Sequence, residues 1–459
     1  MNNSRKSTTW QKVRKFFNDI HLWIGLISGI ILFVVCLSGT IYTFSSDIQE
    51  MIEPEKYSVV IPGGKEKLST EAILKQLPDS FRAMRATAVM IPSDPSRSYQ
   101  ITFVKKESKG KDGEKAEKKP REQDGVKEAG EKREKSSARL AAADIPKDST
   151  RKEAAVQGGQ RREGGGSGGG RQRGTTYFVN PYTAEVLGTT EGPASGFFMQ
   201  MFRLHRWLLL DTEIGRPIVG WATVLFSLLV ITGWIIWFPQ KIKTWKQGLK
   251  IKFSANWKRV NHDLHNSLGF YASFLLIIMS LTGLTWSFEW YRTGFMKVLG
   301  AYKSPDIKEA PIVSKVPDDS VIVKPTVAEY IATADQVFGY PGNYRLQFAA
   351  GEDGTVTISK NKIGFFAPAA ADRLVLDQYS KEVLKQEIFR DKKLGERIAG
   401  SVKALHVGDV YGTFSKILYF IACLIATSLP ITGTLIWFNK LKKNPRKAKP
   451  LSSEMISLQ

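Results

Sequence analysis

Four long apolar runs constrain the fold of this chain more than any other feature. They cover roughly residues 22–44, 217–238, 266–288 and 411–438. Each run is long enough to cross a hydrocarbon core of about 30 Å, which needs about 20 apolar residues. Lys416, near one end of the last run, is the one obvious charge within them. The sequence therefore predicts an integral membrane protein with four spans.

The net charge of +22 reflects basic residues beside the spans, not a nucleic-acid surface. Lysine and arginine gather in the N-terminal segment, in the loop 240–264 and in the tail 439–459. Four spans place all three segments on one side, and the positive-inside rule makes that side cytoplasmic. We therefore expect a multi-pass protein of the bacterial inner membrane with both termini cytoplasmic and two large periplasmic loops. We expect membrane lipid as a partner and no nucleic-acid partner.

The first run and the cysteines have plain interpretations. The first run is longer than the about 7–15 residues of a signal-peptide core, so it is expected to remain as a span. Cys36 and Cys423 both lie inside apolar runs. They are interpreted as small buried apolar residues, not as a disulfide or a metal pair.

The predicted fold class is an α-helical membrane protein with four transmembrane helices in two tandem repeats and two small α+β periplasmic modules. The predicted segments are a cytoplasmic N-terminus (1–20), helix 1 (21–45), module 1 (46–213), helix 2 (214–239), a cytoplasmic loop (240–264), helix 3 (265–290), module 2 (291–408), helix 4 (409–438) and a cytoplasmic tail (439–459). Within module 1, the insert 105–174 consists of Lys, Glu, Gly and Arg tracts and is predicted to be disordered.

The modules show a repeated strand and helix pattern around that insert. In module 1 we expect a strand at 55–62, a helix at 69–77 and a strand pair within 86–104. In module 2 we expect a helix at 327–338 followed by strands. The segments "VNPYTAEVLG" and "VLDQYSKEVLK" further indicate two copies of one small unit.

All four spans end in one pattern: "LSGTIYTF", "ITGWIIWF", "LTGLTWSF" and "ITGTLIWF". The glycines of this pattern would let helices, or a flat cofactor, approach closely. Helix packing and interfacial aromatic belts are the simpler explanation of the same endings. The glycines are Gly39, Gly233, Gly283 and Gly433.

Four of the five histidines occupy equivalent positions in the two halves. His21 and His265 each precede their span's glycine by 18 residues, as 39 − 21 and 283 − 265 show. His205 and His406 precede theirs by 28 and 27, as 233 − 205 and 433 − 406 show. The topology places the first two at the cytoplasmic ends of spans and the other two at the periplasmic ends. The fifth, His262, has no counterpart and is expected to be an ordinary surface residue.

Paired imidazoles from different helices suit a haem iron, which takes one axial ligand on each face of its ring. Zinc usually needs four ligands, and the cysteines lie in the wrong places. A proton relay would need a carboxylate at mid-membrane depth, and the four runs contain none. A lone interfacial histidine is more commonly a polar anchor, but four repeated positions favour ligation. Second-shell or propionate roles are open to Asp19, Asp263, Arg203, Arg206 and Arg216.

The chain resembles the PepSY-associated transmembrane family. The resemblance rests on "VRKFFNDIHLWIGLISGIILFVVCLSGTIYTF", "YFVNPYTAEVLG", "RLHRWLL" and "ITGTLIWF", and it covers nearly the whole chain except the insert. That family includes iron-regulated membrane proteins and ferric-siderophore reductases of the ferrioxamine-reductase type. The resemblance implies two outer PepSY modules and, for the reductase members, two haems b. If the ligands of the reductase members are carried over by position, the axial ligands would be His21 with His265 and His205 with His406.

These observations lead to three hypotheses. The first is a di-haem reductase that passes electrons from a cytoplasmic reductase or quinol to a periplasmic ferric siderophore or other Fe(III) chelate. No dinucleotide-binding glycine fingerprint occurs in the short cytoplasmic segments, so the donor would be a separate molecule. The second is a membrane-anchored binding or inhibitory protein without redox activity. The third is a siderophore permease component. The four spans contain no buried charge that could couple transport, so they do not favour this hypothesis.

Overall fold

The computed structural model describes residues 9–106, 174–239, 245–307, 310–318 and 323–442. The predicted disordered insert 105–174 therefore lies almost wholly outside the described residues, as do the ends of both predicted termini. The chain on either side of residues 105–173 forms one compact unit.

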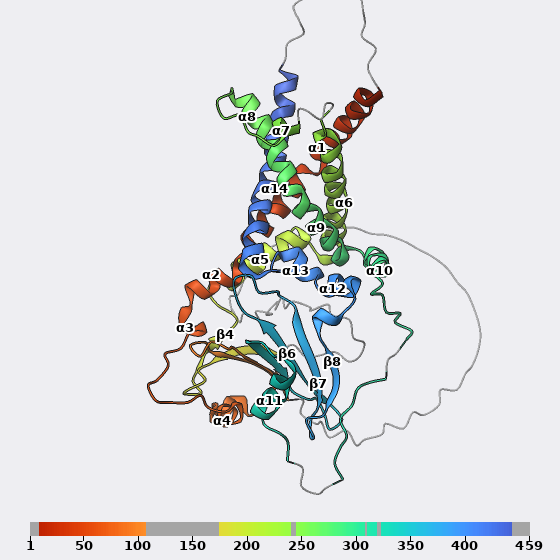
Figure 1. Ribbon diagram of the computed structural model, residues 1–459. Helices are drawn as coiled ribbons and strands as arrows, with labels where there is room; N and C mark the ends of the chain where they lie inside the picture. The colour runs from red at the N-terminus through yellow and green to blue at the C-terminus, as the bar shows by residue number, and fades with distance from the viewer. Residues whose placement is uncertain (1–8, 107–173, 240–244, 308–309, 319–322, 443–459) are drawn as a thin grey trace, which may run out of the picture. The chain divides into compact units, whose positions relative to one another are not determined.

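Four helices are long and apolar enough to cross a membrane, which confirms the predicted spans. They are α1 (Thr9–Thr43), α6 (Thr212–Trp237), α9 (Gly269–Ser287) and α14 (Gly412–Leu441). The third span begins earlier, in α8 (Trp257–Asp263), and reaches α9 through a π turn, η3 (Leu264–Leu268). Within the bundle α1 packs on α6 and α14, and α9 packs on the same two helices (Figure 1).

Small residues bring these helices together. Ala272, Ala422 and Ala426 are buried at the centre of the bundle beside Val230 and Leu276. Lipid is as apolar as these side chains, so close backbone approach and packing hold the helices together more than hydrophobic burial does.

The long loop between the first two spans and the long loop between the last two together form a single antiparallel sheet of eight strands. Its order is β4-β3-β2-β1-β5-β6-β7-β8. The strands are β1 (Met84–Ile91), β2 (Tyr99–Lys105), β3 (Thr175–Val179), β4 (Val186–Thr189), β5 (Gly342–Gln347), β6 (Thr355–Lys362), β7 (Ala371–Asp377) and β8 (Val383–Glu387).

The continuous sheet differs from the expected pair of separate modules. Each half supplies four strands, and β1 pairs with β5 to join them, with Val89 opposite Leu346. Without that pairing both strands would present an unpaired edge. The helices α4 (Thr70–Gln76) and α11 (Val327–Val337) contribute to the shared core, where Ile73 and Ala334 are fully buried. Both helices match their predicted positions.

The prediction of a strand at 55–62 is wrong. The chain there forms a short helix, α3 (Pro54–Tyr57), and then one isolated bridge between Ser58 and Arg97. Pro54 occupies the first turn of that helix, where its fixed φ favours helical structure and its missing N–H costs nothing.

Short helices connect the sheet to the spans. They are α2 (Ser45–Ile52), α5 (Ser195–Trp207), α10 (Glu289–Val298), α12 (Leu394–Gly400) and α13 (Val402–Val407). His205 lies on α5, outside the four spans. The remaining short elements are η1 (Asp79–Phe81), α7 (Trp245–Gly248) and η4 (Phe389–Asp391).

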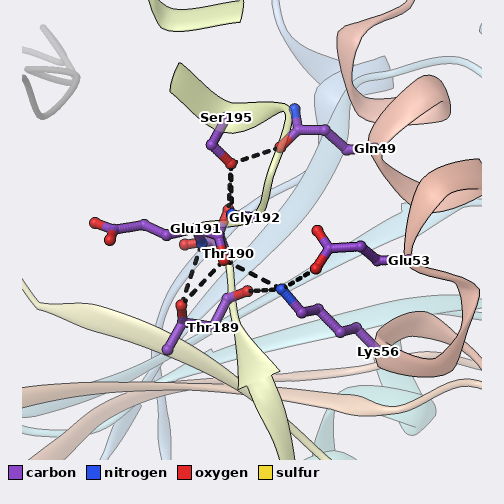
Figure 2. A network of polar contacts seen from close by, with 8 residues as sticks. All are labelled: Gln49, Glu53, Lys56, Thr189, Thr190, Glu191, Gly192 and Ser195. Atoms are coloured by element: carbon purple, nitrogen blue, oxygen red, sulfur yellow. Dashed lines mark hydrogen bonds and ion pairs between the residues drawn. The ribbon is translucent and has the colours of Figure 1, made fainter. Parts of the chain in front are cut away.

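A polar network fixes the start of α5 to the chain that follows α1 (Figure 2). The hydroxyl of Ser195 donates to Gln49 at 3.1 Å and accepts from the backbone N–H of Gly192 at 2.7 Å. The ammonium of Lys56 donates to the carbonyl of Glu191 at 3.1 Å and pairs with Glu53. α5 is thereby held at the end of α1.

Candidate functional site

The bundle has two ends with different surroundings. The basic end contains the start of α1, the end of α6, α8 and the end of α14. The sheet end contains the opposite ends of the four spans together with α5 and α13, whose contacts are with α1 and α9 (Figure 1). Each end holds one pair of histidines.

His21 and His265 meet at the basic end. Their ring centroids lie 6.4 Å apart, with the ring planes at 88°. His21 projects from the continuous helix α1, whereas His265 projects from the π turn that joins α8 to α9. A π turn widens the helix locally and is frequent at functional sites. The two imidazoles therefore come from opposite halves of the chain, as the sequence predicts.

His205 and His406 meet at the sheet end. Their ring centroids lie 6.1 Å apart, with the planes at 54°. His205 lies near the end of α5, and His406 lies near the end of α13. The ring of Trp286 packs edge-on against His406 at 5.2 Å. This pair also joins one residue from each half.

Each glycine of the repeated span ending lies against one of these four imidazoles. A Cβ at Gly39 would lie 2.8 Å from Nδ1 of His205, and one at Gly283 would lie 3.0 Å from Cε1 of His406. At the basic end a Cβ on Gly433 would lie 3.1 Å from His265. On Gly233 it would lie 3.6 Å from His21. The glycines therefore leave room for the rings, a role that the sequence left open between helix packing and a cofactor.

Every one of the four imidazoles uses its Nδ1 in a hydrogen bond. At the basic end Nδ1 of His21 lies 2.8 Å from the hydroxyl of Thr232, and Nδ1 of His265 lies 2.8 Å from that of Thr432. Thr232 directs its own proton to the carbonyl of Leu228 at 2.8 Å. Its oxygen is therefore left to accept from the ring. Thr432 likewise donates to carbonyls of its own helix.

At the sheet end the closest partners are backbone carbonyls, although the hydroxyl of Thr282 also lies 3.3 Å from Nδ1 of His406. Nδ1 of His205 lies 2.8 Å from the carbonyl oxygen of Val35, and Nδ1 of His406 lies 2.9 Å from that of Met279. Val35 and Met279 each precede their helix's glycine by four residues. A carbonyl only accepts, so Nδ1 carries the proton in both rings.

This hydrogen bonding leaves Nε2 of each ring as an unprotonated lone pair. Metal-binding histidines commonly donate their other ring N–H in this way, which fixes the tautomer and orients the ring. Two imidazoles that share one metal at about 2.0–2.1 Å per nitrogen would place their centroids about 6.3 Å apart. The observed separations of 6.4 and 6.1 Å fit that arrangement.

The donor set favours a metal that brings most of its own ligands. Among the described residues, no group of three or more His, Cys, Asp or Glu side chains is arranged to hold a metal ion. Two imidazoles are too few for a structural zinc site, which needs four protein ligands. They match the axial requirement of haem iron, whose macrocycle supplies the other ligands.

A cavity of about 260 Å³ lies at the basic-end pair. Both imidazoles line it, and its walls include the small residues Gly25, Gly29 and Ala426. Polar groups in the lining are few, and they include Asn18, His262, Asn266 and Lys440. A largely apolar space with a few polar groups is typical of a cofactor site.

The model of the PepSY-associated TM region matches residues 19–440 of this chain. The chain belongs to the PepSY-associated transmembrane family. No curated protein matches the chain. The family match covers all four paired histidines and all four span-ending glycines, so the site described above lies within the region that defines the PepSY-associated family.

In this PepSY-associated protein, Asp19 and Asp263 each precede a basic-end histidine by two positions. The carboxylate of Asp263 is buried and accepts from Nε of Arg259 at 2.9 Å and from the backbone N–H of Lys252 at 3.3 Å. It therefore fixes the loop before α8, while Thr432 is the partner of His265. Asp19 is exposed on α1, and Thr232 is the partner of His21. The hydrogen-bond partners of these two rings are therefore threonines, and a role of Asp19 or Asp263 toward a bound group stays a prediction.

The arginines considered for propionates lie at the sheet end. Arg206 stacks over the rings of Phe202 and Trp207 at 5.7 and 5.3 Å. Arg203 is partly buried on the same helix, whereas Arg216 is exposed on α6. Among the described residues, the indole Nε1 of Trp207 is buried and has no hydrogen-bond partner. That donor is available to an acceptor on a bound group.

Burial acts on the ionisation of the sheet-end pair. Desolvation lowers the pKa of His205, and desolvation together with the proximity of His205 lowers the pKa of His406 to about 4. Both rings are therefore neutral near pH 7, the state in which Nε2 can bind a metal.

Sequence reasoning missed several residues of the site. Thr232 and Thr432 immediately precede their glycines, and this Thr-Gly dipeptide was itself a visible signal. His262 was expected to be an ordinary surface residue, yet it lines the cavity at the basic end.

Proposed function

We propose that the chain is a transmembrane di-haem reductase. It would pass electrons from the cytoplasmic side or the quinol pool to a periplasmic ferric siderophore or another Fe(III) chelate. The observation that carries the proposal is the presence of two opposed histidine pairs, one at each end of the bundle. Their ring separations of 6.4 and 6.1 Å suit one shared metal each.

The chain's own residues would hold two haems b in defined positions. His21 with His265 and His205 with His406 would supply the axial nitrogens. The hydrogen bonds at Nδ1 fix each ring's rotation and tautomer, and the glycines allow the rings to lie close to the neighbouring helix. Bound haem would supply one-electron chemistry across the bilayer.

The proposed substrate follows from the chemistry of iron chelates. Fe(III) is held far more tightly than Fe(II) by hard oxygen chelators, so one electron transferred outside the membrane releases the metal. The electron would enter at the basic end from a quinol or a cytoplasmic reductase. The basic segments beside the spans support a cytoplasmic location for that end.

Polar residues near the pairs suit the carboxylates of a porphyrin. At the basic end Lys440 and His262 line the cavity together with Asn18. At the sheet end the indole N–H of Trp207 and the nearby guanidinium of Arg206 are the corresponding groups. A cation beside each propionate would offset the cost of placing a carboxylate near apolar surface.

An absorbance spectrum of the purified full-length protein tests the proposal. We expect Soret and α bands typical of six-coordinate b-type haem, sharpened by dithionite, and about two haems per chain in a pyridine assay. Val60→Ala changes an exposed residue away from both histidine pairs, keeps all four proposed ligands and should keep the six-coordinate spectrum. A colourless protein from haem-supplied cells would refute the proposal and would favour a binding protein without redox activity.

A further inference from the structure

The turn between β6 and β7 carries an apolar surface that the histidine site does not explain. This aromatic turn comprises residues 363–370, with the sequence Ile-Gly-Phe-Phe-Ala-Pro-Ala-Ala. It has no charged or polar side chain. Ile363, Phe365 and Phe366 are 49, 50 and 64 % exposed. Adjacent large apolar side chains that remain exposed usually mark an interaction surface.

Backbone contacts hold the aromatic turn against the start of the fourth span. Pro368 forms a β-bridge with Tyr411, and the N–H of Ala369 donates to the carbonyl of Val410 at 3.2 Å. The N–H of Phe414 donates to the carbonyl of Phe365 at 3.3 Å. The turn is therefore fixed to the first turn of α14.

Aromatic packing and one glycine support the same contact. The rings of Phe366 and Phe414 lie 5.1 Å apart, and Phe414 is itself 41 % exposed. Gly412 has φ +59°, and a Cβ there would lie 2.9 Å from the carbonyl oxygen of Phe365. A side chain at Gly412 would therefore be strained and would force the turn away from α14.

The length of α14 indicates the depth of this contact. Its 30 residues extend about 45 Å, whereas the hydrocarbon core is about 30 Å thick. At least one end of α14 therefore stands in the interfacial region. Lys416 supports this depth, because its ammonium pairs with Asp47 and lies over the ring of Phe44. Interfacial lysines commonly place an apolar stem in lipid and the charge near the headgroups.

We propose that the aromatic turn inserts Phe365 and Phe366 into the interfacial region of the leaflet at the sheet end. The occupant of this surface is phospholipid. Charged residues border the turn at Lys362 and Asp372, so only the apolar tip is suited to enter the membrane. Phe and Leu side chains of interfacial protein segments enter the bilayer at this level. The turn would fix the eight-stranded sheet to the membrane surface independently of any haem.

Spin-label accessibility tests the proposal on the full-length protein. Phe366→Cys would be labelled with a nitroxide in a Cys36→Ala/Cys423→Ala background and reconstituted in phosphatidylcholine vesicles. Val60→Cys is the matched control. Val60 is 86 % exposed, and among the described residues its loop forms no backbone hydrogen bond with a span. We expect the label at 366 to collide several-fold more with oxygen, and several-fold less with a water-soluble nickel chelate, than the label at 60.

Two other outcomes would overturn the proposal. Equal nickel accessibility at positions 366 and 60 would place the turn in water. Low accessibility to both oxygen and nickel would show that protein, such as a second copy of the chain, covers it.

A second measurement avoids the cysteine background. Benzoylphenylalanine at position 366 of the otherwise native chain should form phospholipid adducts on illumination, and the same residue at position 60 should not. Adducts to protein alone at position 366 would refute the proposal, because they would identify the partner as a polypeptide.

Discussion

At the basic end the closest partners of the imidazoles are threonine hydroxyls, whereas at the sheet end the closest partners are backbone carbonyls. Thr232 and Thr432 serve the first pair, and the carbonyls of Val35 and Met279 serve the second. Both arrangements protonate Nδ1 and leave Nε2 free. The difference teaches that the same ligand geometry can depend on a replaceable side chain or on the helix backbone itself.

The two ends also differ in how tightly the glycines hold the rings. At the sheet end a Cβ would approach His205 to 2.8 Å and His406 to 3.0 Å. At the basic end the closest approaches would be 3.1 and 3.6 Å, and the cavity of about 260 Å³ lies beside those rings. The sheet-end pair is therefore the more sterically constrained of the two.

The largest expected effect comes from removing a ligand at one end only. His205→Ala should lower the haem content from about two per chain to about one, and His21→Ala should do the same for the other site. The physical reason is that an axial imidazole contributes the main protein bond to the iron. Haem content by pyridine assay, with Val60→Ala as control, measures the effect. If either variant kept two six-coordinate haems, the pairing assignment would be wrong.

Replacing a glycine by alanine should affect the sheet-end pair more than the basic-end pair. Gly39→Ala places a Cβ 2.8 Å from His205, and the resulting overpacking should cost about 1–3 kcal/mol and displace the ring. Gly233→Ala places its Cβ at 3.6 Å from His21, an ordinary contact. We expect loss of the sheet-end six-coordinate spectrum in the first variant and little change in the second. An equal response of both ends would contradict the steric difference.

Removing a hydroxyl should affect the basic end alone. Thr232→Val keeps the side-chain shape but deletes the acceptor for Nδ1 of His21. Such partners typically change metal affinity by about 10–100-fold, so haem should transfer faster to an acceptor apoprotein. Thr223→Val is the matched control on the same helix, because the Thr223 hydroxyl donates to the carbonyl of Val219 at 2.7 Å in its own helix. Faster haem loss from Thr223→Val than from Thr232→Val would reject this role.

The smallest expected effect is a pH dependence at the sheet end. The pKa of His406 is lowered to about 4 by burial, against about 6.5 in an unfolded chain. Between these values the unfolded state binds the proton and the folded state does not. Stability from this residue is therefore full above pH 6.5 and is lost as the pH falls toward 4.

Thermal unfolding of haem-free protein measures this dependence. The native chain should lose more of its Tm between pH 6.5 and 4.5 than His406→Gln, whose side chain does not titrate. Identical pH profiles of the two proteins would show that burial does not act on this imidazole in the way described.

Much of the architecture could be predicted because its signals repeat along the chain. The four apolar runs specify spans through length alone, and the duplicated histidine positions specify which rings belong to each end. The identity of the Nδ1 partners could not be predicted in this way. It depends on how each helix is rotated about its axis, and that rotation is set by packing between helices from different halves.

The sheet and the π turn show where local pattern is insufficient. The strand alternation in β1 and β5 predicts two strands, but it does not say that they pair with each other across the two halves. Nothing in the sequence Leu264–Leu268 marks a widened helical turn, although that turn carries His265. Both features arise from contacts between residues distant in sequence.

The strand pairing at the centre of the sheet bears on how such a chain arose. Leu346 precedes Ile358 of β6 by 12 residues, as Val89 precedes Ile101 of β2, so Val89 and Leu346 are equivalent positions of the two halves. They lie directly opposite each other in the sheet, and both are fully buried. A position that faces its own equivalent marks a local two-fold axis, the hallmark of an isologous dimer. The polypeptide thus folds as a homodimer would, with its two subunits fused end to end.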